Sequence, residues 1–373
     1  MRIAVFKERA AHERRVAVTG ETVRKFTALG AQIVVEHGAG ESAAIRDSEY
    51  AEAGAHLATA AEAAADADMV LAVRAPDPQM LQGVRRGAVV AALFDPFTDR
   101  ALVDAYATAG LEALSMEFMP RITRAQSMDV LSSQSNLSGY KAVLAAADQY
   151  GRAFPLMMTA AGTISAARVF VMGVGVAGLQ AIATARRLGA QVSATDVRSA
   201  TREQILSLGA KPVFVEEVAG IEGEGSGGYA TEMSEEYQRA QAELVSSHVA
   251  KQDIVITTAL IPGRAAPRLI SDAQVATMKP GSVIFDLAVA QGGNVEGSVP
   301  DEIVERHGVW LMGYSNTPSH LAADASALYA RNLYNFLNAF WDKEAGRPVL
   351  DEEIGDAVRL TRDGAVVNGR LSS

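Results

Sequence analysis

Short runs of apolar, mostly β-branched residues alternate along this chain with longer segments in which apolar residues recur every three or four positions. The short runs predict strands, and the longer segments predict amphipathic helices. Strands that alternate with helices are typical of a parallel sheet covered by helices on both faces. The early part of the chain therefore predicts a doubly wound α/β domain, with strands at 3–5, 15–18, 33–35, 69–73, 89–93 and 111–115 and helices at 22–29, 58–65 and 100–109.

A second series of the same kind follows a long, alanine-rich helix predicted at 136–150. It contains two strands around a glycine cluster, further strands at 213–215, 254–257, 283–286 and 309–313, and a last helix at 322–339. We predict that the chain leaves its first domain near residue 132 and returns to it near 325. The expected fold is α/β, with two doubly wound parallel-sheet domains joined by long helices, the first made of 1–132 plus 325–373 and the second of 133–324.

Composition narrows the possible functions. The chain has 373 residues, which favours two domains, and a net charge of −10, which argues against nucleic acid and against attraction to anionic lipid. It has no cysteine, and its 6 histidines lack metal-ligand spacing, so we expect no metal site. The longest nearly uncharged stretch, 169–185, is too short to span a bilayer, so we expect no direct membrane insertion and a cytoplasmic protein.

The glycine cluster is the most informative motif. Gly173, Gly175 and Gly178 read G-x-G-x-x-G between an apolar run and a helix-favouring stretch. In a dinucleotide site the first glycine permits the tight turn, the second lets the backbone approach a pyrophosphate, and the third lets helix and strand pack closely. The helix then offers unpaired N–H groups and the positive end of its dipole to the phosphates. The motif predicts a dinucleotide-binding domain.

An acidic residue stands at the place where such a site needs one. Asp196 ends the second apolar run, 18 residues after Gly178, and a carboxylate at about this spacing accepts hydrogen bonds from the adenosine ribose. The same carboxylate would repel a 2′-phosphate, so NAD(H) is expected in preference to NADP(H). Arg198 lies nearby and could bind such a phosphate, which leaves the alternative open.

A polar segment lies where the chain should pass between the domains. Residues 120–129 contain two arginines, a glutamine and an aspartate. Clefts between domains are favoured ligand sites, and this combination suits a carboxamide and a ribose. The alternative is a solvated linker with helix caps at Ser132 and Ser135.

Two loops could also contact a nucleotide. Residues 216–236 are rich in glycine and acids, and this composition predicts a mobile surface loop that acts as a lid, with Tyr229 following Gly227 and Gly228. Thr258, Ala259 and Leu260 follow a predicted strand, where adenine or nicotinamide would rest. The alternative for the second loop is an ordinary connection between strand and helix.

Together these motifs resemble the NAD(H)-binding domain I, or alpha-type subunit, of proton-translocating nicotinamide nucleotide transhydrogenase. The resemblance covers nearly the whole chain and is most specific in MPRITRAQSMDVLSSQSNLSGYKAV, MMTAAGT, GVGVAGLQAIATARRLGA, TDVR, GGYATEM, TTALIPGRAAP and MKPGSVIFDLA. It implies a pair of Rossmann-like domains, usually in a homodimer. It also implies hydride exchange between NAD(H) on this chain and NADP(H) on a partner subunit, coupled to proton movement by a membrane-spanning partner. The chain would then be peripheral to the inner membrane.

The resemblance also implies roles for individual residues. Arg121, Gln126 and Asp129 match the loop that holds the nicotinamide end, and we expect them to serve hydride transfer. Tyr229 matches the tyrosine of a loop that closes over the nucleotide. The full set of expected cofactor-binding residues is Ser127, Met128, Ser132, Gly173, Gly175, Val176, Ala177, Gly178, Asp196, Val197, Arg198, Gly228, Tyr229, Gln241, Thr258, Ala259 and Leu260.

Alanine dehydrogenase belongs to the same superfamily and is the alternative. Arg15 occurs in both patterns and could bind a substrate carboxylate, but the lysine and histidine of alanine dehydrogenase are replaced by Arg74 and by the region of Phe94. Oxidising an amino acid needs a general acid or base near pH 7, whereas direct hydride transfer between two nicotinamide rings moves no proton at the reacting carbons. The missing histidine therefore favours transhydrogenation.

Overall fold

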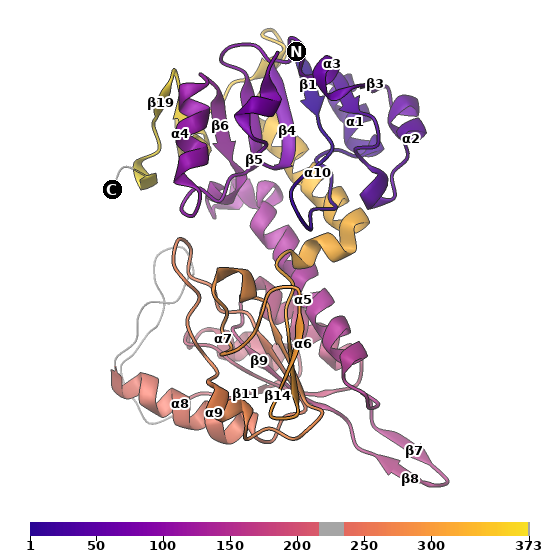
Figure 1. The fold of residues 1–373 in the computed structure, drawn as a ribbon, viewed down its shortest axis with the longest axis vertical. Coiled ribbons are helices and arrows are strands. Elements are labelled where there is room, and N and C mark those ends of the chain that lie inside the picture. Colours follow the sequence, from indigo (N-terminus) through magenta and orange to yellow (C-terminus); the bar gives the residue numbers. More distant parts are fainter. Residues whose placement is uncertain (216–234, 372–373) are drawn as a thin grey trace. The chain divides into compact units, whose positions relative to one another are not determined.

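The computed structural model describes residues 1–215 and 235–371 (Figure 1). They form two compact units, each built around its own sheet: unit 1 comprises Met1–Gln134 and Ser319–Ser373, and unit 2 comprises Ser135–Pro318. The fold class expected from the sequence is confirmed, because each sheet is parallel apart from one edge strand in unit 2.

Unit 1 is built on six parallel strands in the order β3-β2-β1-β4-β5-β6. Ile3 of the central strand β1 pairs with Ile33 on one side and with Met69 on the other. The chain builds outward from β1 to β3 and then from β4 to β6, so the strand order reverses between β1 and β4. The strands are β1 (Arg2–Val5), β2 (Gln32–Glu36), β3 (His56–Ala58), β4 (Met69–Arg74), β5 (Val89–Leu93) and β6 (Glu112–Ser115).

Helices cover both faces of this sheet. Because successive side chains of a strand point to opposite faces, Ile3 and Val5 enter one core and Ala4 enters the other. The first core includes residues of α1 (Gly20–Ala28), α2 (Asp47–Glu52), α10 (Ala322–Ala339) and α11 (Glu352–Val358), and the second includes α3 (Ala60–Ala64) and α4 (Arg100–Thr108). Two small hairpins complete the unit: β16 (Trp341–Asp342) with β17 (Arg347–Pro348), and β18 (Thr361–Arg362) with β19 (Ala365–Val366).

Unit 2 contains a seven-stranded sheet in the order β11-β10-β9-β12-β13-β15-β14, in which only β14 is antiparallel to its neighbour. Its strand order reverses between β9 and β12. The strands are β9 (Arg168–Met172), β10 (Gln191–Thr195), β11 (Lys211–Pro212), β12 (Ile254–Thr257), β13 (Val283–Asp286), β14 (Ile303–Arg306) and β15 (Val309–Met312). The helices are α5 (Val130–Gln149, shared with unit 1), α6 (Val176–Arg187), α7 (Thr201–Ser207), α8 (Glu235–Val249) and α9 (Asp272–Val275), and the hairpin β7 (Met157–Thr159) with β8 (Gly162–Ile164) precedes β9.

Three local expectations were wrong. The apolar run at 15–18 forms no strand, because its residues are buried against α10, where the Val16 N–H donates to the Ser326 hydroxyl (3.0 Å). The strand expected at 213–215 lies at Lys211–Pro212. The helix caps expected at Ser132 and Ser135 are absent, because α5 begins earlier, at Val130, and both serines lie inside it.

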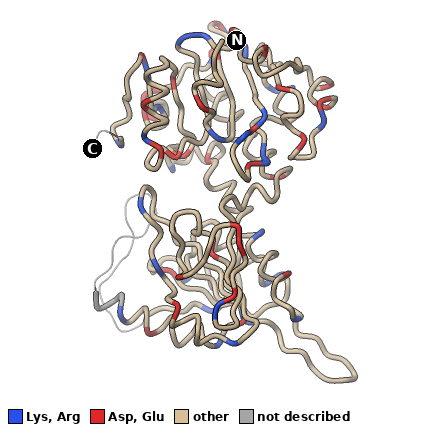
Figure 2. Tube along the Cα trace, viewed as in Figure 1, with Lys and Arg blue, Asp and Glu red and all other residues tan. Residues whose placement is uncertain are grey.

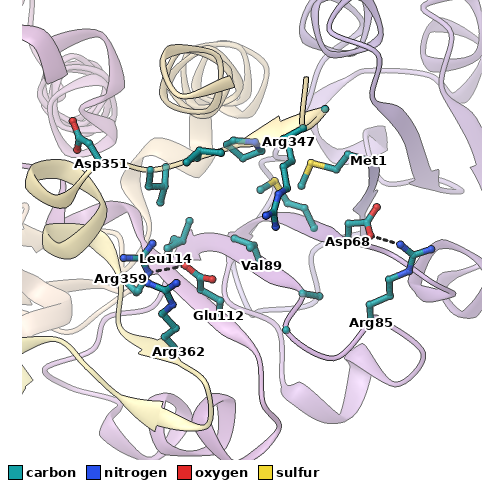
Figure 3. A pocket seen from close by; sticks show the side chains of 18 of the residues that line it. Met1, Asp68, Arg85, Val89, Glu112, Leu114, Arg347, Asp351, Arg359 and Arg362 are labelled. Carbon is teal, nitrogen blue, oxygen red and sulfur yellow. Dashed lines mark hydrogen bonds and ion pairs between the residues drawn. The ribbon is translucent and has the colours of Figure 1, made fainter. Parts of the chain in front are cut away.

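A pocket of about 600 Å³ opens at the amino edge of the unit 1 sheet, where β4, β5 and β6 begin (Figure 3). Two of its arginines pair with its own acids, Arg85 with Asp68 (2.6 Å) and Arg359 with Glu112 (2.7 Å). Acidic and basic residues are likewise interspersed throughout both units (Figure 2). Ligands of parallel sheets bind beyond the opposite, carboxyl edge, so a candidate site is expected at that edge.

Candidate functional site

The two segments singled out in unit 2 lie together at the carboxyl edge of its sheet. The glycine cluster follows β9, residues 258–260 follow β12, and these two strands are direct neighbours, with Met172 opposite Thr257. The strand order reverses between them, and ligands of doubly wound sheets bind at such a switch point. The Thr258 hydroxyl joins the two segments by donating to the Gly173 carbonyl oxygen (3.0 Å).

The three glycines meet different surroundings. Gly173 has a φ of +96°, which favours glycine, and a Cβ there would lie 2.5 Å from the Thr258 hydroxyl oxygen. A Cβ on Gly178 would lie 1.9 Å from the Gly173 carbonyl oxygen, so the helix can approach the turn only without a side chain. Gly175 faces open space, with no atom within 4 Å of its Cβ position. The turn is thus tightly packed behind Gly173 and Gly178 and open in front of Gly175, an arrangement that fits a pyrophosphate.

Helix α6 starts directly after this open position. Gly175 is its N-cap and supplies no side-chain hydrogen bond, so no side chain caps the first-turn N–H groups, which include those of Val176 and Ala177. Helix α5 supports this end closely, because a Cβ on Gly139 would lie 2.0 Å from the Ala177 carbonyl oxygen. The first turn of α6 is therefore a fixed and positively polarised surface of the kind that binds phosphate.

Asp196 directly follows β10 and is 7% exposed. Its carboxylate accepts hydrogen bonds from the Val174 N–H (2.6 Å) and from the backbone and side chain of Arg198. Burial alone would raise the pKa of Asp196, but these hydrogen bonds outweigh it and lower the pKa. Asp196 is therefore an ionised acceptor beside the glycine turn, with the half-buried Val197 next to it.

Asn294 and Asp286 complete the site and were missed from the sequence. Asn294 is fully buried and binds both backbone polar groups of Ala259, while Leu260 is 43% exposed. Asp286 ends β13 and accepts from the Val295 N–H (3.1 Å). The available signal was the position of Asp286, which ends a strand as the acid of a nucleotide site does.

The expected nicotinamide segment lies in unit 1. Arg121, Gln126 and Ser127 are exposed, whereas the Met128 side chain is 5% exposed and belongs to the core. The Ser127 carbonyl accepts hydrogen bonds from Asn332 and Asn335 of α10 (2.9 and 3.1 Å), so the segment is fixed to that helix, and Met128 is available only through its backbone.

Asp129 and Ser132 bind each other. The Asp129 carboxylate accepts from the Ser132 N–H (2.9 Å) and the Ser132 hydroxyl (2.6 Å), which makes Asp129 the cap of α5. The exposed segment thus ends at a rigid helix start. Arg124 fastens it further by pairing with Asp351 (2.7 Å) and Glu353 beside α11.

The remaining expected contacts lie on and before α8. Gln241 is half-buried on this helix. Gly228 and Tyr229 lie outside the described residues, as does most of the segment expected to act as a lid.

Unit 1 has its own switch point, and the chain's own side chains fill it. The Glu8 carboxylate accepts from the N–H groups of Val73 (2.6 Å) and Arg74 (3.2 Å) at the end of β4, and burial raises its pKa to about 7. An anionic phosphate would be repelled by the ionised Glu8. This unit therefore offers no second nucleotide site of the kind seen in unit 2.

Arg15 lies close by and is 3% exposed. Its guanidinium donates to both carboxylate oxygens of Glu13 (2.8 and 2.7 Å) and to the Gln134 side chain (2.8 Å). In this arrangement Arg15 neutralises an internal acid.

Residues 1–215 and 235–371 also bear on metal and membrane binding. They contain no group of three or more histidine, cysteine or acidic side chains that could hold a metal ion. Within the same ranges, no helix combines the length and the hydropathy that crossing a bilayer requires.

Known proteins resemble this chain over its full length. The family domains described as "Alanine dehydrogenase/PNT, N-terminal domain" and "Alanine dehydrogenase/PNT, C-terminal domain" match residues 4–138 and 142–369. An NAD(P) transhydrogenase subunit alpha chain of Rhodospirillum rubrum is 51% identical over 380 residues, which cover 100% of this chain and 99% of that protein. The solved transhydrogenase from Sinorhizobium meliloti has a TM-score of 0.89 and 52% identity, with 98% of this chain and 99% of that chain covered.

Alanine dehydrogenase is a more distant relative. The enzyme of Mycobacterium tuberculosis is 31% identical over 310 residues, covering 80% of this chain and 76% of that protein. With both family domains matched in order and homology along its whole length, the chain belongs to the alanine dehydrogenase/PNT family.

Proposed function

We propose that this chain is the NAD(H)-binding component of a proton-translocating NAD(P) transhydrogenase. NAD(H) held here exchanges a hydride with NADP(H) held on a partner subunit. A membrane-spanning partner couples this exchange to proton translocation and keeps the chain at the cytoplasmic side of the inner membrane. The names of the relatives that share about half of its sequence support this proposal.

The observation that carries the proposal is the open glycine turn beside Asp196 at the switch point of unit 2. The first-turn N–H groups of α6 bind the pyrophosphate in front of Gly175. Asp196 accepts hydrogen bonds from the adenosine ribose, and its neighbours Val197 and Arg198 line the same position. The loop at 258–260, Gln241, and Gly228 with Tyr229 contact the rest of the nucleotide.

The 121–132 segment holds the nicotinamide end in this proposal. The exposed side chains of Arg121 and Gln126 supply hydrogen bonds to a carboxamide and a ribose. Asp129 and Ser132, which bind each other, fix the direction of this segment, and Ser127 and the Met128 backbone lie between. Orientation of this kind is what hydride transfer requires, because two rings must meet in a defined geometry.

The alternative is a soluble NAD-dependent alanine dehydrogenase. Two local features argue against it. Arg15 is buried and bound to Glu13 and Gln134, and Phe94 packs edge-on against Tyr106 (5.0 Å between ring centroids). An arginine free to bind a substrate carboxylate is thus not found at 15, nor a general base at 94.

Mixing experiments separate the two functions. The purified chain is combined with the NADP(H)-binding domain of a transhydrogenase, and reduction of an NAD analogue by NADPH is followed. We expect the partner domain to be required for hydride transfer. NADH production from alanine and NAD without any partner would instead establish the dehydrogenase. Binding of NADH with neither activity would point to a silent binding module and overturn the proposal.

We also propose that the chain forms a homodimer. The β7–β8 hairpin of unit 2 is exposed along its whole length and carries apolar side chains, with Met158 82% exposed and Met157 45% exposed (Figure 1). Apolar groups so exposed are commonly covered by a partner, and a second copy is the simplest one. Light scattering on M158D should then report a monomer and on the unmodified chain a dimer; a monomeric unmodified chain would exclude the homodimer.

A further inference from the structure

We propose that Asn294 is a positioning residue for the nucleotide, acting through the backbone of Ala259; this inference rests on the proposed function of unit 2. The Asn294 side chain is fully buried. Its Oδ1 accepts from the Ala259 N–H (3.0 Å), and its Nδ2 donates to the Ala259 carbonyl (2.9 Å) and to the Pro267 carbonyl (2.8 Å). One amide thus holds the loop after β12 at two points.

The backbone of Asn294 holds the far end of the same loop. Its carbonyl accepts from the N–H groups of Leu269 (2.7 Å) and Ile270 (3.0 Å). Between 258 and 269 the chain forms no helix or strand of its own, so regular hydrogen bonding does not set its path. The position of this loop therefore depends on Asn294 more than on its own secondary structure.

The hold on Ala259 reaches the glycine turn through one residue. Thr258 precedes Ala259, and its hydroxyl donates to the Gly173 carbonyl (3.0 Å), the same oxygen that the third glycine of the motif approaches. A shift of Ala259 would move Thr258 and loosen that contact. Asn294 is in this way connected to the phosphate end of the site, although it does not reach the surface.

The same bonds decide what the loop can offer a nucleotide. Both polar backbone atoms of Ala259 are already taken by Asn294, so Ala259 gives a ligand only apolar contact. Leu260 and Ile261 are 43% and 37% exposed next to it. Asn294 thus holds in place a small apolar surface, which suits one face of a flat heteroaromatic ring.

Asn294 can do this because its own turn is rigid. Gly293 has a φ of +78°, and a Cβ there would lie 2.8 Å from the Asp286 Oδ2. That oxygen accepts from the Val295 N–H (3.1 Å) and the Ser298 hydroxyl (2.8 Å). The turn is therefore fastened to the end of β13, and Asn294 joins the loops that follow two neighbouring strands.

The test uses three variants of the full chain. N294A removes the amide, and N294D keeps its size while replacing the donor with an acceptor that faces two carbonyls. N368A is the matched control, because Asn368 is also buried (3% exposed) and also binds backbone carbonyls, but in unit 1. The readouts are the thermal midpoint, the Kd for NADH by fluorescence titration, and KM and kcat of hydride transfer with the partner domain.

We expect N294A and N294D to raise the Kd and KM for NADH about tenfold or more, with kcat at saturation within about twofold, since lost hydrogen bonds of buried groups have effects of this order. N368A should lower the thermal midpoint and leave the Kd within about twofold of the unmodified chain. N294D decides the matter if N294A does not fold.

Unchanged Kd in both Asn294 variants would overturn the positioning role while leaving the proposed function standing. An increase in Kd of the same size in N368A would overturn it as well, because the effect would then reflect general destabilisation. If the unmodified chain itself bound no NADH, the proposed function would fail, and the positioning role would fall with it.

Discussion

The guanidinium of Arg198 lies side by side with the carboxylate of Asp196, its Nε donating to Oδ1 and its Nη2 to Oδ2, each at 2.9 Å. The backbone N–H groups of Val174 and Arg198 donate to the same two oxygens. A ribose hydroxyl that binds Asp196 must therefore replace a hydrogen bond that Arg198 makes. The ion pair also neutralises a nearby cation that could attract a 2′-phosphate.

Asp196→Ala should weaken NADH binding by roughly 1–3 kcal/mol, the usual effect of removing a charged hydrogen-bond partner. It also releases Arg198 from this ion pair, so discrimination against NADPH should decrease. Fluorescence titrations with both nucleotides measure the two effects. The double variant D196A/R198A is the control for the second effect, because NADPH binding should fall again when that cation is removed. Equal NADH affinity in D196A and the unmodified chain would contradict the ribose contact.

Two neighbouring glycines should respond in opposite ways to alanine. Gly178→Ala places a Cβ 1.9 Å from the Gly173 carbonyl oxygen, and such overpacking typically costs about 1–3 kcal/mol of unfolding free energy. Gly175→Ala meets no atom within 4 Å, so stability should be retained. Its methyl group instead occupies space in front of the helix start, so NADH binding should weaken. Denaturant unfolding and NADH titration of both variants check this, and a stable G178A with normal NADH affinity would be inconsistent with the packing described.

Stability should depend on pH through Glu8. Burial raises the pKa of Glu8 from 4.5 to about 7. Between these values the unfolded chain releases a proton that the folded chain retains, so the free energy of unfolding falls as pH rises from about 4.5 to about 7 and is constant above, as far as this group is concerned. Glu8→Gln removes the titration, so its stability should fall by roughly 1–3 kcal/mol less than that of the unmodified chain between pH 5 and 8.

Denaturant unfolding at several pH values measures this difference in slope. The slope is the informative quantity, because Gln cannot accept from Val73 and Arg74 as a carboxylate does and its stability will be offset at every pH. Parallel curves for the two proteins would show that Glu8 does not titrate in this range.

Arg121 and Asp129 should separate function from stability. Asp129→Ala removes the cap of α5 and should cost about 0.5–2 kcal/mol of unfolding free energy. Arg121→Ala changes an exposed side chain and should alter stability by less than about 0.5 kcal/mol. Both should slow hydride transfer with the partner domain if the segment holds the nicotinamide. Full transfer activity in R121A would remove that residue from the proposed site.

The sequence predicts features that depend on local pattern. Strands buried on both faces are continuous apolar runs, so the predicted bounds of β5, β12 and β13 agree with the structure, as do those of α10. The glycine spacing also marks the turn at the switch point of unit 2. These features need no knowledge of distant contacts.

Contacts between distant residues cannot be predicted in this way. Asn294 binds Ala259 across 35 residues, and Glu8 binds Val73 across 65. Arg15 looks available for a ligand in the sequence, but its partner Gln134 lies 119 residues away. The apolar run after Arg15 resembles a strand for a related reason: burial against α10 produces the same pattern as burial in a sheet.

The return of the chain to unit 1 sets an order in time. Tyr329 of α10 donates to the Ala72 carbonyl (2.9 Å), and Thr361 donates to the Leu111 carbonyl (2.8 Å), so the earliest strands are completed by the latest residues. Unit 2 is one uninterrupted segment. A ribosome releases that segment in full while unit 1 still lacks two of its helices, so the nucleotide domain can assemble first during translation.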